Sequence, residues 1–79
     1  MPRCNEQVKR LRMQLQLSQN RMAGRAGLDG ATYRRAEGGR EKVTELTIEK
    51  IAAAFSALLK RPILATSLTM EEPDSEVAA

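Results

Sequence analysis

The order of apolar and polar residues along the chain predicts a series of short helices and no strand. Between residues 6 and 15, apolar side chains recur at Val8, Leu11 and Leu15 with basic residues between them. That spacing places them on one face of a helix, and Asn5 is a candidate N-cap. No segment alternates apolar and polar residues as a half-buried strand does. We therefore expect an all-α chain.

Two further helices are predicted close together in the sequence, over residues 18–37. Ser18 can cap a helix that runs to about residue 25, and Gly27 can end it in a left-handed conformation. Asp29 can then cap a helix over residues 30–37, which the glycine pair after it would end. Two helices of about eight residues, joined by about three, must cross at a steep angle. This is the helix-turn-helix arrangement.

The fourth and fifth predicted helices follow a polar connector over residues 40–43. The fourth helix begins after Thr44 or Thr47, since either residue can cap it. Its apolar positions follow the clearest helical spacing in the chain and are Ile48, Ile51, Ala52, Phe55, Leu58 and Leu59. Pro62 suits the first position of a short fifth helix that runs to about residue 68.

These elements predict a compact bundle of about five short helices over residues 5–68. Residues 69–79 carry acidic but no basic side chains and are predicted to be a disordered acidic tail. Over residues 1–68, 13 basic side chains stand against 6 acidic ones, a net charge of +7. Such a charge favours a polyanion or an acidic protein surface as partner, although surplus basic residues also simply solvate a fold.

Candidate catalytic and metal-binding residues are scarce. Cys4 is the single cysteine, expected near a loose end as an incidental reduced thiol, and the chain has no histidine. A lone cysteine makes neither an internal disulfide nor a four-ligand zinc site, and the commonest general base is missing. Glu45 and Glu49 lie one helical turn apart beside lysines, which indicates exposed ion pairs rather than catalysis. We expect no enzyme, no metal, no cofactor and no small-molecule ligand.

The longest run of apolar residues, 51–55, is far shorter than the about 20 residues that span a membrane. No apolar stretch of the kind found in signal peptides follows Met1. We expect a cytoplasmic protein without a membrane partner, encoded by a prokaryote, a phage or another mobile element.

Two stretches carry a family resemblance: residues 17–28 read LSQNRMAGRAGL, and residues 32–39 read TYRRAEGG. Together they resemble the lambda-repressor-like helix-turn-helix family, of the Cro/repressor or XRE type. That family has leucine-serine-glutamine at its second helix and a recognition helix ending in glutamate, a variable residue and glycine. The resemblance covers about residues 6 to 59. It implies a lambda-repressor-like fold that binds double-stranded DNA, with residues 30–37 in the major groove.

The resemblance also implies roles for single residues around this helix. Arg12 and Glu37 are expected to form a structural ion pair between the first helix and the end of the recognition helix. Gln19 is expected to contact a phosphate at the start of the second helix. Further phosphate candidates are Ser18, Arg40 and Lys42.

Within the recognition helix, the resemblance implies that Tyr33 and Ala36 face the core. Tyr33 replaces the family's usual aliphatic residue, so its hydroxyl is expected at the rim of the core, with a phosphate contact as the alternative. The positions left for the DNA groove are Gly30, Ala31, Thr32, Arg34 and Arg35. Arg35 lies where the family often places a base-reading side chain, and an arginine can bind a guanine edge through two hydrogen bonds. Gly30 and Ala31 stand where many members carry polar residues, so sequence reading is expected to depend on Arg34, Arg35 and Thr32.

Two functions are compatible with this sequence. The first is a transcriptional regulator, expected to be a repressor that binds an inverted repeat as a homodimer, because one small domain makes too few base contacts for specificity. The candidate dimer residues are Leu58, Leu59, Ile63, Leu64 and Leu68, which can equally close the core of one monomer. The second is a protein-interaction module on the same fold, an antitoxin or antiactivator adaptor.

Overall fold

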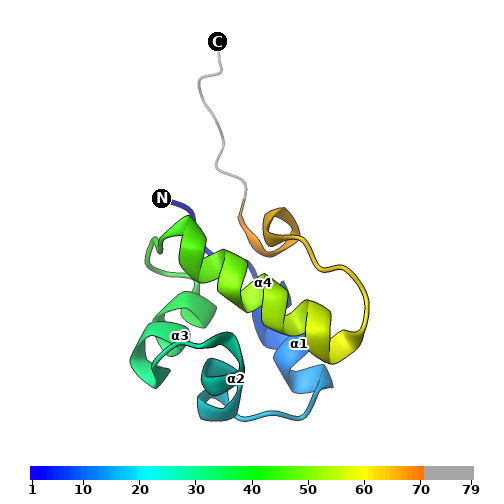
Figure 1. Ribbon diagram of the computed structural model, residues 1–79. Coiled ribbons are helices and arrows are strands. Elements are labelled where there is room, and N and C mark those ends of the chain that lie inside the picture. Colours follow the sequence, from blue (N-terminus) through cyan, green and yellow to red (C-terminus); the bar gives the residue numbers. More distant parts are fainter. Residues whose placement is uncertain (71–79) are drawn as a thin grey trace.

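The computed structural model describes residues 1–70, which form four α-helices and one short 3-10 helix (Figure 1). The elements are α1 (Gln7–Gln14), α2 (Gln19–Ala26), α3 (Gly30–Gly38), α4 (Glu45–Leu59) and η1 (Ala65–Leu68). Within these residues no strand forms, and a single isolated bridge pairs Cys4 with Thr69. The predicted all-α class is therefore confirmed.

Capping side chains fix where three of the helices begin. Ser18, Asp29 and Thr44 have extended backbones, and each accepts a hydrogen bond from the backbone N–H three residues later. These bonds satisfy amides that a helix leaves without an internal partner. Thr44, and not Thr47, thus caps α4. The N-cap of α1 is Glu6 rather than the predicted Asn5, whose carboxamide oxygen accepts from the Gln7 N–H at 2.9 Å.

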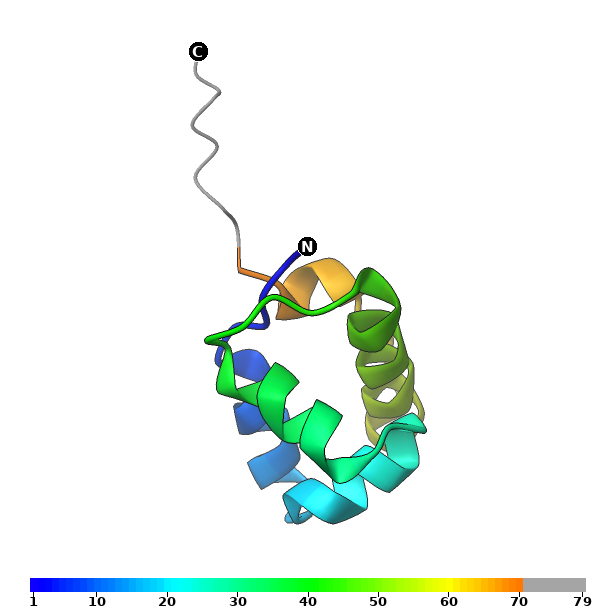
Figure 2. The same cartoon turned by 90° about the vertical axis from the view of Figure 1, so that its left-hand side faces the viewer.

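The core is built from the inner faces of all four α-helices, which Figure 2 shows around a common centre. The largest fully buried side chains are Tyr33, Phe55, Met22, Ile48, Ile51, Leu68, Val8 and Cys4. Burial of each large apolar side chain contributes about 1.5–3 kcal/mol. With only two aromatic residues in the sequence, aliphatic side chains and Met22 fill most of this core.

The predicted fifth α-helix over Pro62 to Leu68 is wrong. The backbone is extended at Leu64, and only the four residues of η1 are helical. The Ile63 N–H donates to the Ser56 hydroxyl at 2.9 Å, and the Leu68 carbonyl accepts from the Asn5 N–H at 2.8 Å. These backbone groups bind α4 and the N-terminal segment, so they are not available for a regular helix.

The N-terminal segment is part of the fold, which corrects the expectation that Cys4 lies at a loose end. The Pro2 carbonyl accepts from the Val43 N–H at 2.8 Å, and the Arg3 carbonyl accepts from the Met70 N–H at 2.8 Å. Cys4 is 1 % exposed, and burial together with the nearby Glu37 raises the pKa of its thiol to about 11.

The boundaries of the fold are therefore wider than the predicted residues 5–68. Backbone hydrogen bonds begin at Pro2 and extend to Met70. The first two residues assigned to the predicted tail belong to this ordered part. The rest of the predicted acidic tail, 71–79, lies outside the described residues.

Candidate nucleic-acid interface

One side of α3 is exposed and the other is buried, because its residues alternate with helical spacing. The buried side consists of Tyr33, Ala36 and Glu37. The exposed positions follow i, i+3, i+4 and i+7 and are Ala31, Arg34, Arg35 and Gly38. We call these four residues the α3 stripe. An exposed helix face with two adjacent arginines offers the charge and the hydrogen-bond donors that a nucleic acid requires.

The turn between α2 and α3 holds the two helices side by side, as both views show (Figures 1 and 2). Gly27 has φ +73°, a left-handed conformation that glycine adopts without steric cost. The Leu28 N–H donates back to the Ala23 carbonyl at 2.9 Å. Ala23, 1 % exposed, leaves room for the close approach of α3. Two helices joined by a tight turn thus lie close to the predicted residues 18–37.

Arg34 is tied to α2 by a hydrogen bond that crosses the first turn of α3. Its Nη1 donates to Oδ1 of Asn20 at 3.0 Å. A Cβ atom built on Gly30 would lie 2.7 Å from that oxygen and 3.0 Å from Arg34 Nη1. The contact therefore passes over the one residue of this turn that has no side chain. Asn20 was not among the predicted site residues, because sequence spacing does not reveal this contact.

Arg35 makes an ion pair with the linker that follows α3. Its Nε lies 3.3 Å from Oε1 of Glu41, and the two side chains are 50 % and 63 % exposed. Exposed ion pairs of this kind contribute about 1 kcal/mol or less, so Arg35 can exchange Glu41 for another anion at low cost. Glu41 is a second residue that the sequence prediction missed.

The remaining predicted groove residues lie at the start of α3. Thr32 is half-buried, and its hydroxyl and backbone N–H both donate to the Asp29 carboxylate. Those two hydrogen bonds lower the pKa of Asp29. The Thr32 hydroxyl therefore donates its proton to the capping residue Asp29, and its oxygen can still accept a hydrogen bond. Gly30 is half-buried, whereas Ala31 is exposed.

A buried polar network joins α1 to the end of α3. Arg12 Nε donates to Glu37 Oε1 at 2.7 Å and Nη2 to Oε2 at 3.0 Å, while Nη1 donates to the Leu17 carbonyl at 2.8 Å. Gln19 Nε2 adds a hydrogen bond to Glu37 Oε2 at 3.1 Å. Burial raises the pKa of Glu37, but the hydrogen bonds, above all that from Arg12, outweigh it and lower the pKa overall. The network thus holds an ionised carboxylate between two helices.

Tyr33 lies beside this network, and the expectation that its hydroxyl reaches the rim of the core is wrong. The side chain is 0 % exposed, and its hydroxyl lies beside the Glu37 carboxylate without the geometry of a regular hydrogen bond. Burial and the adjacent Glu37 carboxylate raise the pKa of Tyr33. The hydroxyl therefore stays protonated, away from any surface ligand.

The predicted phosphate-contacting residues occupy two places. Ser18 and Gln19 lie at the N-terminus of α2, where Ser18 Oγ accepts from the Arg21 N–H at 3.1 Å. Arg40 and Lys42 are exposed in the linker between α3 and α4. Gln19 is half-buried because of its bond to the buried network, so only part of its carboxamide faces solvent.

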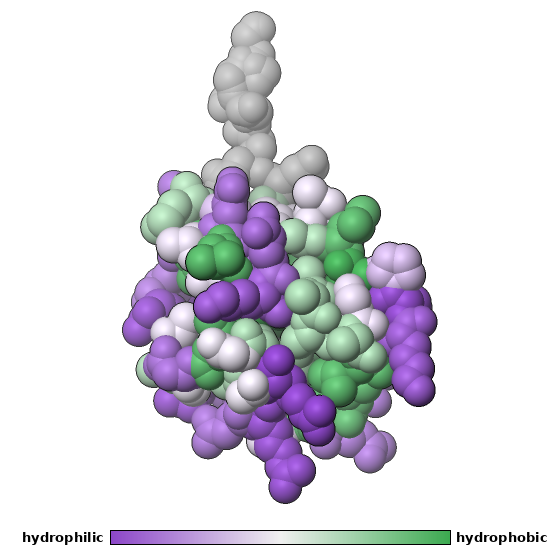
Figure 3. All heavy atoms as spheres, viewed as in Figure 1, coloured by the Kyte–Doolittle hydropathy of each residue, from purple (hydrophilic) through white to green (hydrophobic). Residues whose placement is uncertain are grey.

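The five predicted dimer residues do not form one exposed surface. Leu68 is 0 % exposed and belongs to the monomer core, so its assignment to a dimer interface is wrong. Leu58, Leu59 and Ile63 are half-buried against that core, and Leu64 is 65 % exposed. Figure 3 shows hydrophobic residues gathered on the side of the molecule where the second half of α4 and the following segment lie.

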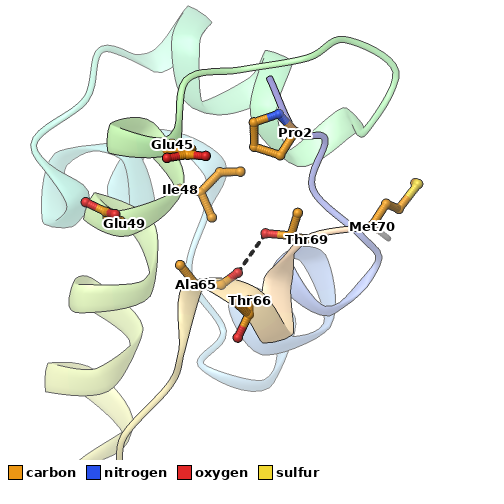
Figure 4. Close-up of a pocket in the computed structure, with 8 residues that line it drawn as sticks. All are labelled: Pro2, Glu45, Ile48, Glu49, Ala65, Thr66, Thr69 and Met70. Carbon is orange, nitrogen blue, oxygen red and sulfur yellow. Dashed lines mark hydrogen bonds between the residues drawn. The ribbon is translucent and has the colours of Figure 1, made fainter. Parts of the chain in front are cut away.

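A pocket of about 410 Å³ lies between the N-terminal segment, the start of α4 and η1 (Figure 4). Ile48 and Ala65 line it, and the Thr69 hydroxyl at its wall donates to the Ala65 carbonyl at 2.8 Å. None of the described residues that line it belongs to α2 or α3. The pocket is therefore separate from the α3 stripe.

Residues 1–70 contain no group of three or more histidine, cysteine or carboxylate side chains placed to hold a metal ion. In the same part of the chain, no helix is long and apolar enough to cross a lipid bilayer.

Comparison with known proteins gives one family match. The model of a family described as "Helix-turn-helix domain" matches residues 6–59, which includes all four α-helices. Searches among curated proteins and among solved structures gave no match.

Proposed function

Because the chain belongs to the helix-turn-helix domain family, we propose that it is a sequence-specific regulator of transcription that inserts α3 into the major groove of duplex DNA. The observation that carries this proposal is the α3 stripe, which exposes Arg34 and Arg35 on a helix that is rigidly backed by the core. An α-helix fits the width of the major groove, and base edges there differ for each base pair.

Base reading belongs to the arginines and to the start of α3. Each arginine can bind O6 and N7 of a guanine through two hydrogen bonds, worth about 1–3 kcal/mol of discrimination. Ala31 is exposed and can contact a thymine methyl group. Gly30 allows the backbone to approach the bases closely, and Thr32 offers its hydroxyl oxygen as an acceptor.

Phosphate contacts belong to the N-terminus of α2 and to the linker after α3. The exposed amides at a helix N-terminus bind anions, and Ser18 and Gln19 lie there. The second N–H of the Gln19 carboxamide can donate to a phosphate while the first remains bound to Glu37. Arg40 and Lys42 add positive charge next to the α3 stripe in sequence.

We propose further that two copies bind an inverted repeat as a homodimer and repress transcription by occupying the operator. A single α3 contacts too few base pairs for specificity, whereas a two-fold pair reads two half-sites about 34 Å apart. The half-buried Leu58, Leu59 and Ile63, together with the exposed Leu64, supply an apolar surface for the second copy.

The test is selection by the full chain from a library of randomised DNA duplexes. We expect enrichment of an inverted repeat whose half-sites lie one helical turn apart. Enrichment of one unrepeated half-site would contradict the homodimer, and recovery of random sequences would contradict sequence-specific binding. Failure to retain any duplex at low salt would favour the adaptor function, in which the same fold binds a protein.

A further inference from the structure

The polar contact between Asn20 on α2 and Arg34 on α3 is a solvent-exposed hydrogen bond, a kind that contributes about 1 kcal/mol or less to stability. Both side chains are exposed, and the bond of 3.0 Å joins residues 14 positions apart in sequence. Asn20 bears no charge, so Arg34 keeps its full positive charge. Within residues 1–70, one of the five guanidinium N–H groups makes this hydrogen bond, and the others can still bind a base edge.

Gly30 lies directly beside the two atoms that form this contact. Its φ is not in the left-handed region, where only Gly27 and Gly39 lie among the described glycines. The backbone therefore does not require glycine there. A Cβ there would instead displace the contact, because it would lie 2.7 Å from Asn20 Oδ1 and 3.0 Å from Arg34 Nη1, both at the ends of flexible side chains.

Arg35 differs from Arg34 in the charge of the group that it contacts before DNA binds. Its partner is the Glu41 carboxylate, an anion that must be displaced before Arg35 meets DNA. Arg34 already has a defined direction, set by a neutral acceptor on the neighbouring helix. Fixing a flexible side chain before binding removes part of the entropy that binding would otherwise cost.

We infer that Asn20 is the positioning residue that orients Arg34 for base reading, and that Gly30 leaves the space this contact needs. The inference rests on the proposed DNA-binding function and deepens it. Sequence preference then depends more on Arg34 than on Arg35, and it is set partly by a residue on α2. Neither Asn20 nor Gly30 needs to touch a base for this role.

The experiment compares Kd for the duplex enriched by the wild-type chain with Kd for a random duplex, using fluorescence anisotropy. Asn20→Ala and Gly30→Ala are expected to reduce the ratio of the two constants about 2- to 10-fold. Gly24→Ala is the matched control, because no atom lies within 4 Å of the Cβ that it would add. Thermal unfolding of each variant shows that it is folded.

Asn20→Asp separates positioning from a direct phosphate contact. It replaces the neutral acceptor with a carboxylate that holds Arg34 as Glu41 holds Arg35, so the ratio should fall in addition to the weaker binding of both duplexes. A mere phosphate contact by Asn20 would leave the ratio unchanged. In an Arg34→Ala background, Asn20→Ala should cause no further fall in the ratio. If Gly30→Ala does not fold, the Asn20 variants still test whether Asn20 orients Arg34.

Three results would overturn the inference. An equal loss of affinity for both duplexes in Asn20→Ala, with no change in their ratio, would make Asn20 a phosphate contact. A further fall in the ratio when Asn20→Ala is added to Arg34→Ala would show that Asn20 acts independently. A wild-type chain that binds both duplexes equally would contradict the proposed function as well, before any variant is compared.

Discussion

The bidentate ion pair between Arg12 and Glu37 joins the last turn of α1 to the end of α3. The side chains are 11 % and 4 % exposed, so each charge depends on the other and on Gln19 and Leu17 for its hydrogen bonds. A buried pair adds little net stability compared with a well-packed apolar pair, but loss of one partner leaves an isolated buried charge. Its contribution here is to fix the end of α3 relative to α1.

Glu37→Gln should therefore lower the free energy of unfolding by about 3 kcal/mol at pH 7. The pKa of Glu37 is lowered in the folded chain, so its stabilising effect is complete above the unfolded value of about 4.3. That effect is lost as the pH falls through the lower folded value. Urea unfolding followed by circular dichroism, from neutral to acidic pH, measures both effects.

The wild-type chain should lose more stability on acidification than Glu37→Gln. The variant keeps a smaller acid dependence, because the pKa of Asp29 is also lowered by its capping hydrogen bonds. Parallel pH profiles for the two proteins would show that the Glu37 carboxylate is not held ionised by the network.

Single residues differ in how far the sequence predicts their contacts. The Arg12–Glu37 pair followed from the family resemblance. The Asn20–Arg34 and Arg35–Glu41 contacts did not, because exposed long side chains have many rotamers and only the folded backbone selects one. The depth at which the Tyr33 hydroxyl is buried depends on how tightly α3 packs, which sequence spacing does not determine.

At the level of secondary-structure elements, both ends of α2 and α3 were predictable to within about one residue because local chemistry sets them. For α4 the same chemistry gave Thr44 or Thr47 as the start, but not the end at Lys60, whose φ is 58° without being a glycine. A capping side chain or a left-handed glycine acts within about four residues, and the sequence displays both. The segment after Pro62 was not predictable, since its backbone groups bind the Ser56 side chain on α4 and, 63 positions away in sequence, the Asn5 N–H. Long-range hydrogen bonds of this kind override local helix preference.

The glycines that end α2 and α3 should differ in their sensitivity to substitution. Gly27 and Gly39 have φ of +73° and +71°, so alanine at either position costs about 1–2 kcal/mol. A Cβ on Gly39 would also lie 2.9 Å from the Cys4 carbonyl oxygen, whereas one on Gly27 meets nothing within 4 Å. Gly39→Ala should therefore destabilise the chain more than Gly27→Ala in urea unfolding.

The comparison of these two variants isolates the contact between α3 and the N-terminal segment, because the conformational cost is shared. Equal losses of stability would mean that the segment around Cys4 moves away freely and does not hold the end of α3.

At the scale of the whole molecule, basic residues and exposed apolar residues gather on different parts of the surface. The arginines of the α3 stripe are exposed on the helix-turn-helix, and the apolar residues gather along α4 and the segment after it (Figure 3). The sequence predicted the excess of positive charge but not which leucines remain exposed. Leu68 enters the core because η1 turns back against α1, a result of tertiary packing.

Among the proposed dimer residues, Leu64 is therefore the one whose substitution should change self-association with the least effect on folding. Leu64→Glu places a charge in the proposed dimer surface without removing a core side chain, since Leu64 is 65 % exposed. Sedimentation velocity should show a shift from dimer to monomer. Met13→Glu is the matched control, because Met13 is 57 % exposed on α1, a helix that contributes none of the proposed dimer residues. A dimer that persists in Leu64→Glu, or a monomeric wild-type chain, would contradict the proposed interface.

The central claim is that the chain binds duplex DNA through α3, and a salt series of binding measurements tests it most directly. Anisotropy of a labelled duplex should give an affinity that falls as salt rises, with log K decreasing by about 0.9 per phosphate contact for each unit of log salt. Arg34→Ala/Arg35→Ala should weaken binding about 10-fold or more. Arg10→Ala should leave it nearly unchanged, because Arg10 lies on α1 and pairs with Glu6. Binding that ignores salt, or that is equal in the double variant and the wild type, would contradict the account.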